Sequence, residues 1–158
     1  MPCDRFILLC EDKAHESFAK RWLESAGVDT RRVQVKIAPA AAGSAEAYVA
    51  REFPKAVALF RAKANHQGGL GLLVLVDADL RTVRDRCDQL NQCLLDAGHE
   101  GRRNNERICL LVPRRHIETW TRHANGEVVD EVRDIKRELG TVDADLLKRA
   151  AIRFDELR

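Results

Sequence analysis

The stretch Leu70-Gly-Leu-Leu-Val-Leu-Val-Asp-Ala-Asp79 is the strongest strand signal in the chain. Its first seven residues form an almost wholly apolar run, which is typical of a strand buried on both faces of a parallel sheet. Two aspartates follow at the end of this run, and residues two apart on an extended chain project to the same side. The stretch therefore predicts a central strand that carries a pair of carboxylates to one edge of a sheet.

Three further segments have the composition of strands: Arg5–Cys10, Arg32–Ile37 and Ile108–Val112. The first is continuously apolar, whereas the second alternates apolar and polar residues as edge strands do. Between the strands, helical spacing of apolar residues predicts helices over 15–26, 47–65 and 83–97, and from 115 or 116 onward. Pro54 lies inside the second of these segments and predicts a kink or two abutting helices.

Strands that alternate with helices predict an α/β fold, with a Rossmann-like parallel sheet of about four strands. The first and third strands are the most apolar, so we expect them side by side at the centre, in the strand order 2-1-3-4. The chain of 158 residues is expected to form one domain. Its core would cover about 5–125, and a C-terminal extension with helices within about 128–157 would pack on the sheet or form a dimer contact.

The composition of the chain argues against some classes of function. A formal net charge of +2 argues against a strongly basic nucleic-acid clamp, so any basic surface has to be local. No run approaches the roughly 20 apolar residues of a membrane span, and no signal peptide is visible. We therefore expect a cytoplasmic protein without membrane contact. Its five cysteines are expected to be reduced, with Cys10 and Cys109 buried in strands.

Acidic residues follow both central strands: Glu11 the first, Asp77 and Asp79 the third. In open parallel sheets ligands bind beyond the carboxyl ends of the strands, where the strand order reverses. Clustered carboxylates are costly unless a proton or a cation compensates their charge. Carboxylate oxygens are the ligands that Mg²⁺ and Mn²⁺ prefer. The sequence thus predicts a divalent metal site at Glu11, Asp77 and Asp79.

Other polar residues near these strand ends are secondary candidates. Glu118 follows the fourth strand near a helix start and is a further acidic candidate, and His116 beside it could join the site. Asp12 is interpreted as the cap of the first helix. Four basic residues lie close in sequence to the acidic motifs and, as a cluster at the carboxyl edge of the sheet, favour a phosphate-bearing partner: Lys13, Arg81, Arg84 and Arg115. A further rim could come from Arg102, Arg103, Arg107 and Arg114.

The segment Phe-Ile-Leu-Leu-Cys-Glu11-Asp-Lys with its following helix, together with Leu-Val-Leu-Val-Asp77-Ala-Asp79, resembles the Toprim domain. That domain is shared by topoisomerases, bacterial primases, recombination mediators and overcoming-lysogenization-defect family nucleases. The stretch from Leu-Leu-Val-Pro113 to Glu118-Thr-Trp120 resembles small bacterial Toprim-like proteins, many linked to phage defence or mobile elements. The resemblance covers about residues 5–125.

The resemblance implies Mg²⁺-dependent cleavage of nucleic-acid phosphodiester bonds. It also implies that basic residues such as Lys13, Arg81, Arg84 and Arg115 hold the nucleic-acid backbone. Glu11 matches the motif glutamate, a general acid/base or metal ligand, and Asp77 and Asp79 match the metal-binding pair. Glu118 matches an acidic position that the nuclease-like members place after the next strand, which makes it a catalytic candidate. Many Toprim domains have glycine directly after the motif glutamate, where this chain has Asp12.

Two function classes stay open from the sequence. One is a small catalytic nuclease, acting on DNA rather than RNA by preference. The other is a non-catalytic subunit that binds nucleic acid or protein within a larger complex. A partner such as an ATPase would then supply what this chain lacks, since it has no P-loop. A receiver domain is disfavoured because a fifth strand with its lysine is missing, and a sugar-nucleotide transferase because no donor-binding half is recognisable. A homodimer is also open.

Overall fold

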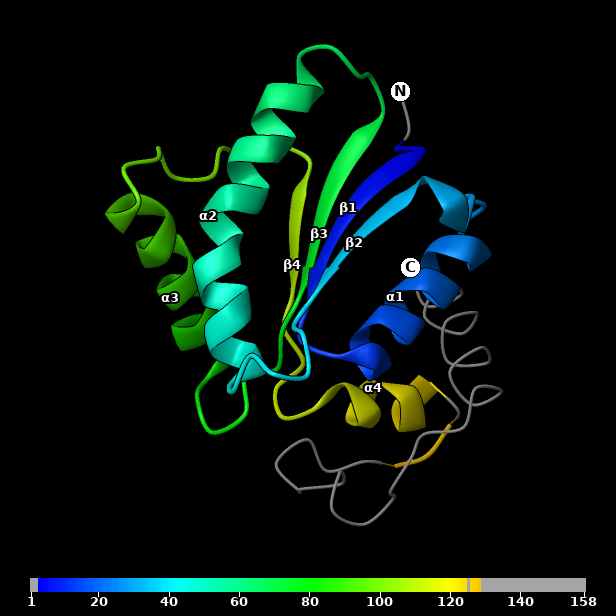
Figure 1. Ribbon diagram of the computed structural model, residues 1–158. Helices are drawn as coiled ribbons and strands as arrows, with labels where there is room; N and C mark the ends of the chain where they lie inside the picture. The colour runs from blue at the N-terminus through cyan, green and yellow to red at the C-terminus, as the bar shows by residue number, and fades with distance from the viewer. Residues whose placement is uncertain (1–2, 125, 129–158) are drawn as a thin grey trace.

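The computed structural model describes residues 3–124 and 126–128. The strands are β1 (Arg5–Cys10), β2 (Val33–Ile37), β3 (Leu70–Leu75) and β4 (Ile108–Leu111), and the helices are α1 (Lys13–Ser25), α2 (Ala45–Ala64), α3 (Val83–Asp96) and α4 (Ile117–Ala124), with a 3-10 turn, η1 (Thr30–Arg32). All pairings are parallel and the strand order is β2-β1-β3-β4 (Figure 1). The predicted fold class and strand order are confirmed.

The register of the strands fixes which residues meet at the carboxyl edge. Cys10 lies beside Leu75, and Leu75 lies beside Leu111. The backbone continues this alignment, because the Ala78 amide donates a hydrogen bond of 2.8 Å to the carbonyl of Pro113. The turns that follow β1, β3 and β4 therefore begin level with one another. This is the edge at which the sequence predicted the site.

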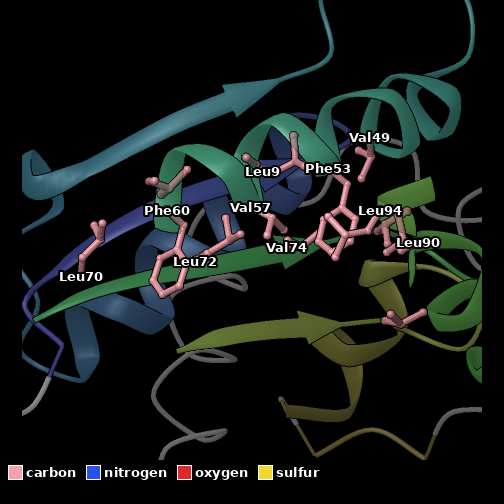
Figure 2. Packing of buried hydrophobic residues seen from close by; sticks show 14 of the residues in the cluster. Leu9, Val49, Phe53, Val57, Phe60, Leu70, Leu72, Val74, Leu90 and Leu94 are labelled. Carbon is pink, nitrogen blue, oxygen red and sulfur yellow. The ribbon is translucent and has the colours of Figure 1, made fainter. Parts of the chain in front are cut away.

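Both faces of the sheet are buried under helices. Alternate residues of β1 and β3 form an apolar cluster with α2 and α3, in which Phe53 and Val57 of α2 pack against the strands (Figure 2). The remaining residues of β1 and β3, including Leu8 and Leu73, face the opposite side of the sheet and pack against α1. Ile117 of α4 joins this second cluster. A continuous apolar strand fits this sandwich because neither of its faces meets water.

Local sequence sets the ends of the helices. Asp12 caps α1, as predicted, by accepting hydrogen bonds from the amides of Ala14 and His15. Thr82 and Asp85 form a capping box at the start of α3, in which each side chain bonds the other residue's amide. Gly27 follows α1 with a φ of +82°, a conformation that glycine adopts without steric cost. These caps place the turns before α1 and α3 firmly at the carboxyl edge.

Of the two alternatives expected at Pro54, a kink or two abutting helices, the second is wrong. A single helix of 20 residues runs through the proline. Pro54 costs the helix one hydrogen bond and causes crowding, at roughly 3 kcal/mol. Packing of the buried α2 residues Val49, Phe53, Val57 and Phe60 against the sheet offsets that cost.

Cys109 is exposed, which contradicts the prediction of a buried thiol, whereas Cys10 is buried as expected. The reason is that β4 is an edge strand, with residues that are partly buried or exposed. The expected C-terminal helices fall almost wholly outside the described residues, as does the dimer contact assigned to them. Within the described part of the chain, no helix combines the length and apolar character needed to cross a membrane.

Candidate metal centre

The turn after β3 carries the two aspartates in an unusual backbone conformation. Asp77 is 1% exposed, and Asp79 has a φ of +54°. Among residues 3–124 and 126–128, Asp79 is the only residue other than glycine with a positive φ. Such a conformation costs free energy, persists only where surrounding contacts hold it, and clusters at functional sites. Here Arg115 Nη1 lies 3.5 Å from the Asp79 carbonyl oxygen.

Two groups of potential metal ligands meet at Asp77. Glu11, His15 and Asp77 form one group, and Asp77, Asp79 and His116 form the other; within each, one ligand atom per residue lies within 4.8 Å of the others. The three predicted ligands are thus brought to one place, together with two histidines. Because Asp77 belongs to both groups, they form one continuous centre.

His15 is fully buried and bridges two carboxylates. Its Nδ1 lies 2.8 Å from Asp12 Oδ1, and its Nε2 lies 3.0 Å from Asp77 Oδ1. Ionised carboxylates only accept hydrogen bonds, so both ring nitrogens must donate and His15 is an imidazolium. Burial by itself would lower the pKa of His15, but the bonds to Asp12 and Asp77 raise it to about 10. In this state the imidazolium orients Asp77, and His15 would have to release a proton before it could coordinate a metal ion.

Glu11 is the strongest sign that the centre is incomplete without a ligand. Its side chain is buried, with the residue 7% exposed, and its Oε1 has no hydrogen-bond partner in the described structure. Burial and the charges of Asp77 and Asp79 raise the pKa of Glu11 to about 7, although His15 opposes them. A buried carboxylate oxygen without a partner calls for a proton or a cation.

His116 faces the aspartate pair from the start of α4. Its Nδ1 lies 3.5 Å from Asp77 Oδ2 and 3.4 Å from Asp79 Oδ1. Burial favours the neutral form of Asp77, but the histidines at positions 116 and 15 outweigh this and lower its pKa. Asp77, Asp79 and His116 supply two carboxylates and an imidazole, a donor set that suits a divalent metal such as Mn²⁺ and, through its oxygens, Mg²⁺. These residues could therefore bind a metal ion, with Asp77, Asp79 and His116 as one candidate ligand set.

Arg86 on α3 supports the aspartate turn from inside the protein. The residue is 1% exposed, and its Nε donates a hydrogen bond of 2.9 Å to the Asp77 carbonyl oxygen. Its Nη1 pairs with Glu46 in the first turn of α2, and its Nη2 lies 3.9 Å from Asp79 Oδ2. One guanidinium thus ties the end of β3 to two helices.

The remaining predicted residues occupy different places. Glu118 is 4% exposed in the first turn of α4, and its Oε2 has no hydrogen-bond partner among the described residues, but it belongs to neither ligand group. Arg81, Arg84 and Arg115 line one hollow beside Asp79. Lys13 instead lies on α1, where its Nζ pairs with Glu16 at 2.7 Å.

Sequence reasoning missed His15 and Arg86, although both leave a trace in the helical spacing. His15 lies three and four residues before Phe18 and Ala19 on the buried side of α1. Arg86 lies four residues before Leu90, which lies four before Leu94, on the buried side of α3. A charged residue in an apolar stripe signals a buried partner.

Comparison with known proteins adds no relative: no family model matches the chain, and no curated protein or solved structure matches it significantly.

Proposed function

We propose that this protein is a small cytoplasmic Toprim-type nuclease that cleaves nucleic-acid phosphodiester bonds with a divalent metal, Mg²⁺ or Mn²⁺. The observation that carries the proposal is that Glu11, whose buried Oε1 has no hydrogen-bond partner in the described part of the chain, shares a centre with Asp77, Asp79 and His116. Its position at the carboxyl ends of two central parallel strands is the usual ligand position of such sheets. The resemblance of the motif residues to Toprim proteins supports DNA as the substrate and phage defence or mobile-element biology as the setting.

A divalent ion held by Asp77, Asp79 and His116 would activate water and offset charge on a phosphate. Glu11 lies next to these ligands, and burial raises its pKa to about 7 in the metal-free protein, which makes its carboxyl group the first candidate for proton transfer. Arg86 and His15 hold Asp77 in place from opposite sides, through its carbonyl and its carboxylate respectively. Glu118, which is buried and close to His116 in sequence, is the second acidic candidate for proton transfer.

A non-catalytic role is the second candidate, and Asp12 is the observation that favours it. Where many Toprim domains have glycine, Asp12 caps α1 and fixes His15 against Asp77. One oxygen of Asp77 is thereby occupied by an imidazolium, which leaves fewer oxygens for metal ions. Such a centre would bind one ion and nucleic acid or a partner protein, such as an ATPase, without cutting.

The test combines metal binding with cleavage on the same preparations. Mn²⁺ and Mg²⁺ binding is measured by calorimetry, and supercoiled plasmid, single-stranded DNA and RNA are incubated with each metal or with chelator. The variant Asp77→Asn/Asp79→Asn removes two ligand charges at nearly constant volume. Asp88→Asn is the matched control, because Asp88 is an exposed acid on α3.

Each outcome has a distinct meaning. The nuclease proposal is supported if the wild type and Asp88→Asn cleave a substrate, and if cleavage is lost in the double variant and in chelator. Metal binding without cleavage of any substrate favours the second candidate. Absence of metal binding by the wild type overturns both.

A further inference from the structure

A hollow of about 520 Å³ opens directly beside the metal centre, between the turn after β3 and the turn after β4. Its wall begins at Asp79, one of the metal ligands, and continues through the residues that precede and open α3. It also includes the two arginines that follow Pro113. We refer to this hollow as the arginine groove, after the four arginines that line it: Arg81, Arg84, Arg114 and Arg115.

The groove concentrates positive charge that the whole chain does not have. Four arginines face one acid, Asp79, in its lining, whereas the formal charge of the protein is only +2. The ion pairs of Arg81 with Glu46 and of Arg84 with Asp88 are both 3.8 Å long, and both arginine side chains are more than half exposed, so these pairs restrain the arginines little. Arginine binds phosphate with two parallel hydrogen bonds, which makes such a groove complementary to a phosphate chain.

The other flank of the centre differs. A hollow along α1 is lined by Lys13, Lys20 and Arg21, but also by the acids Glu16 and Glu24. Glu16 accepts hydrogen bonds of 2.7 Å from both lysines. The two acids on this flank therefore offset most of the charge of the three bases. A polyanion that reaches the metal centre is drawn more strongly to the arginine groove.

Apolar side chains stand exposed within the same groove. Leu80, directly after Asp79, is 87% exposed, and Val83 is 40% exposed. The positive φ of Asp79 turns the backbone at this point. A solitary exposed leucine is ordinary on a protein surface. Here, however, two apolar side chains lie among four arginines, so the groove offers positive charge for a phosphate backbone and an apolar surface for an unpaired base.

We propose that the arginine groove carries one nucleic-acid strand to and from the metal centre, with arginines on its phosphates and Leu80 against an unpaired base. The inference rests on the proposed function and deepens it. It assigns single-stranded or locally unpaired nucleic acid as the preferred ligand. It also gives the strand one path, over the turns after β3 and β4, and leaves α1 uninvolved.

The test measures binding without cleavage. Fluorescence anisotropy of a labelled oligothymidylate and of a blunt-ended duplex is recorded in chelator over a range of salt concentrations. Arg84→Glu and Lys13→Glu make the same charge change on opposite flanks, and both side chains are at least 81% exposed, so neither variant disturbs the core. Leu80→Ala tests the base contact separately.

We expect Arg84→Glu to weaken single-strand binding by about tenfold or more and to reduce the salt slope by about 1, whereas Lys13→Glu changes binding by less than about twofold. Leu80→Ala should lower single-strand affinity by about threefold or more and leave duplex affinity unchanged. Equal losses of single-strand affinity in Arg84→Glu and Lys13→Glu would contradict the proposed role of the arginine groove. An unchanged preference for single strand over duplex in Leu80→Ala would contradict it as well.

Calorimetry with Mn²⁺ on the same proteins separates this inference from the proposed function. A wild type that binds Mn²⁺ but neither oligonucleotide contradicts the groove and leaves the metal centre standing. A wild type that binds the oligothymidylate through Arg84 but no metal contradicts the proposed function and leaves the groove standing.

Discussion

The Nε2 atom of His15 lies 3.0 Å from Oδ1 of Asp77, and both side chains are almost completely buried. This contact joins the first turn of α1 to the end of β3 across 62 residues of sequence. It also leaves Asp77 with a permanent cationic neighbour before any metal binds. Stability and metal binding therefore depend on the same carboxylate.

Replacing His15 tests the structural half of this relationship. His15→Ala leaves Asp77 buried without its imidazolium, and breaking a buried pair from one side costs about 3–5 kcal/mol. We expect the free energy of unfolding at pH 6, measured by urea denaturation in chelator, to fall by about 3 kcal/mol. His66→Ala, at an exposed histidine, is the control and should change it by less than about 0.5 kcal/mol. A similar small loss in His15→Ala would contradict the buried pair.

The acid at position 11 predicts a pH dependence of the metal-free protein. The pKa of Glu11 is about 7 in the folded protein, against an ordinary glutamate value of 4.5 that the unfolded chain retains. Between pH 4.5 and 7, Glu11 is deprotonated in the unfolded chain but still protonated in the folded protein. The free energy of unfolding that protonated Glu11 contributes therefore declines as the pH rises through this range. His15, with a pKa of about 10 against 6.5, contributes constantly below pH 6.5 and loses its contribution only as pH rises toward 10.

The window from pH 4.5 to 6.5 therefore isolates Glu11 from His15. Glu11→Gln cannot ionise, and we expect it to gain about 2 kcal/mol relative to the wild type across this window. Urea titrations of both proteins at several pH values in chelator measure the gain directly. A constant difference between the two proteins would mean that the carboxyl group of Glu11 is not held in its protonated form.

The sequence predicted the parts of this fold that depend on hydrophobic runs. Two continuous apolar strands had to lie together at the centre, and parallel register then brought Glu11 level with Asp77. The edge position of β4 follows from the same strand order, yet Cys109 was expected to be buried because a short apolar run alone does not show which face is covered. Two abutting helices were one alternative expected at Pro54, but packing against the sheet keeps α2 a single helix.

The partners of the acids were harder to predict because they depend on contacts between distant segments. His15 and Arg86 occupy buried stripes of their helices, but the stripe does not say which acid lies opposite. The pairing of Arg86 with Glu46 joins α3 to α2 across 40 residues. His116 was considered because it lies next to Glu118, whereas the structure places it against Asp77 and Asp79 instead.

Arg86 gives a prediction about the shape of the aspartate turn. Arg86→Met keeps the apolar part of the side chain but removes the bond to the Asp77 carbonyl and the charge opposite Glu46. We expect a loss of about 3 kcal/mol in stability and a weaker Mn²⁺ affinity, by about tenfold, in the protein that remains folded. Arg84→Met, on the same helix but 90% exposed on its side chain, should preserve both. Unaltered Mn²⁺ affinity in folded Arg86→Met would remove its role in positioning the ligands.

Metal selectivity tests whether His116 is a ligand. Imidazole suits Mn²⁺ and other transition metals better than Mg²⁺, which prefers oxygen donors. His116→Ala should therefore weaken Mn²⁺ binding by about tenfold or more, while Mg²⁺ binding, carried by Asp77 and Asp79, changes less. Calorimetry with each metal on His116→Ala, and on His123→Ala at an exposed position of the same helix, gives the comparison. Equal losses for the two metals would show that His116 orients the aspartates without touching the ion, because Mn²⁺ accepts an imidazole ligand more readily than Mg²⁺ does.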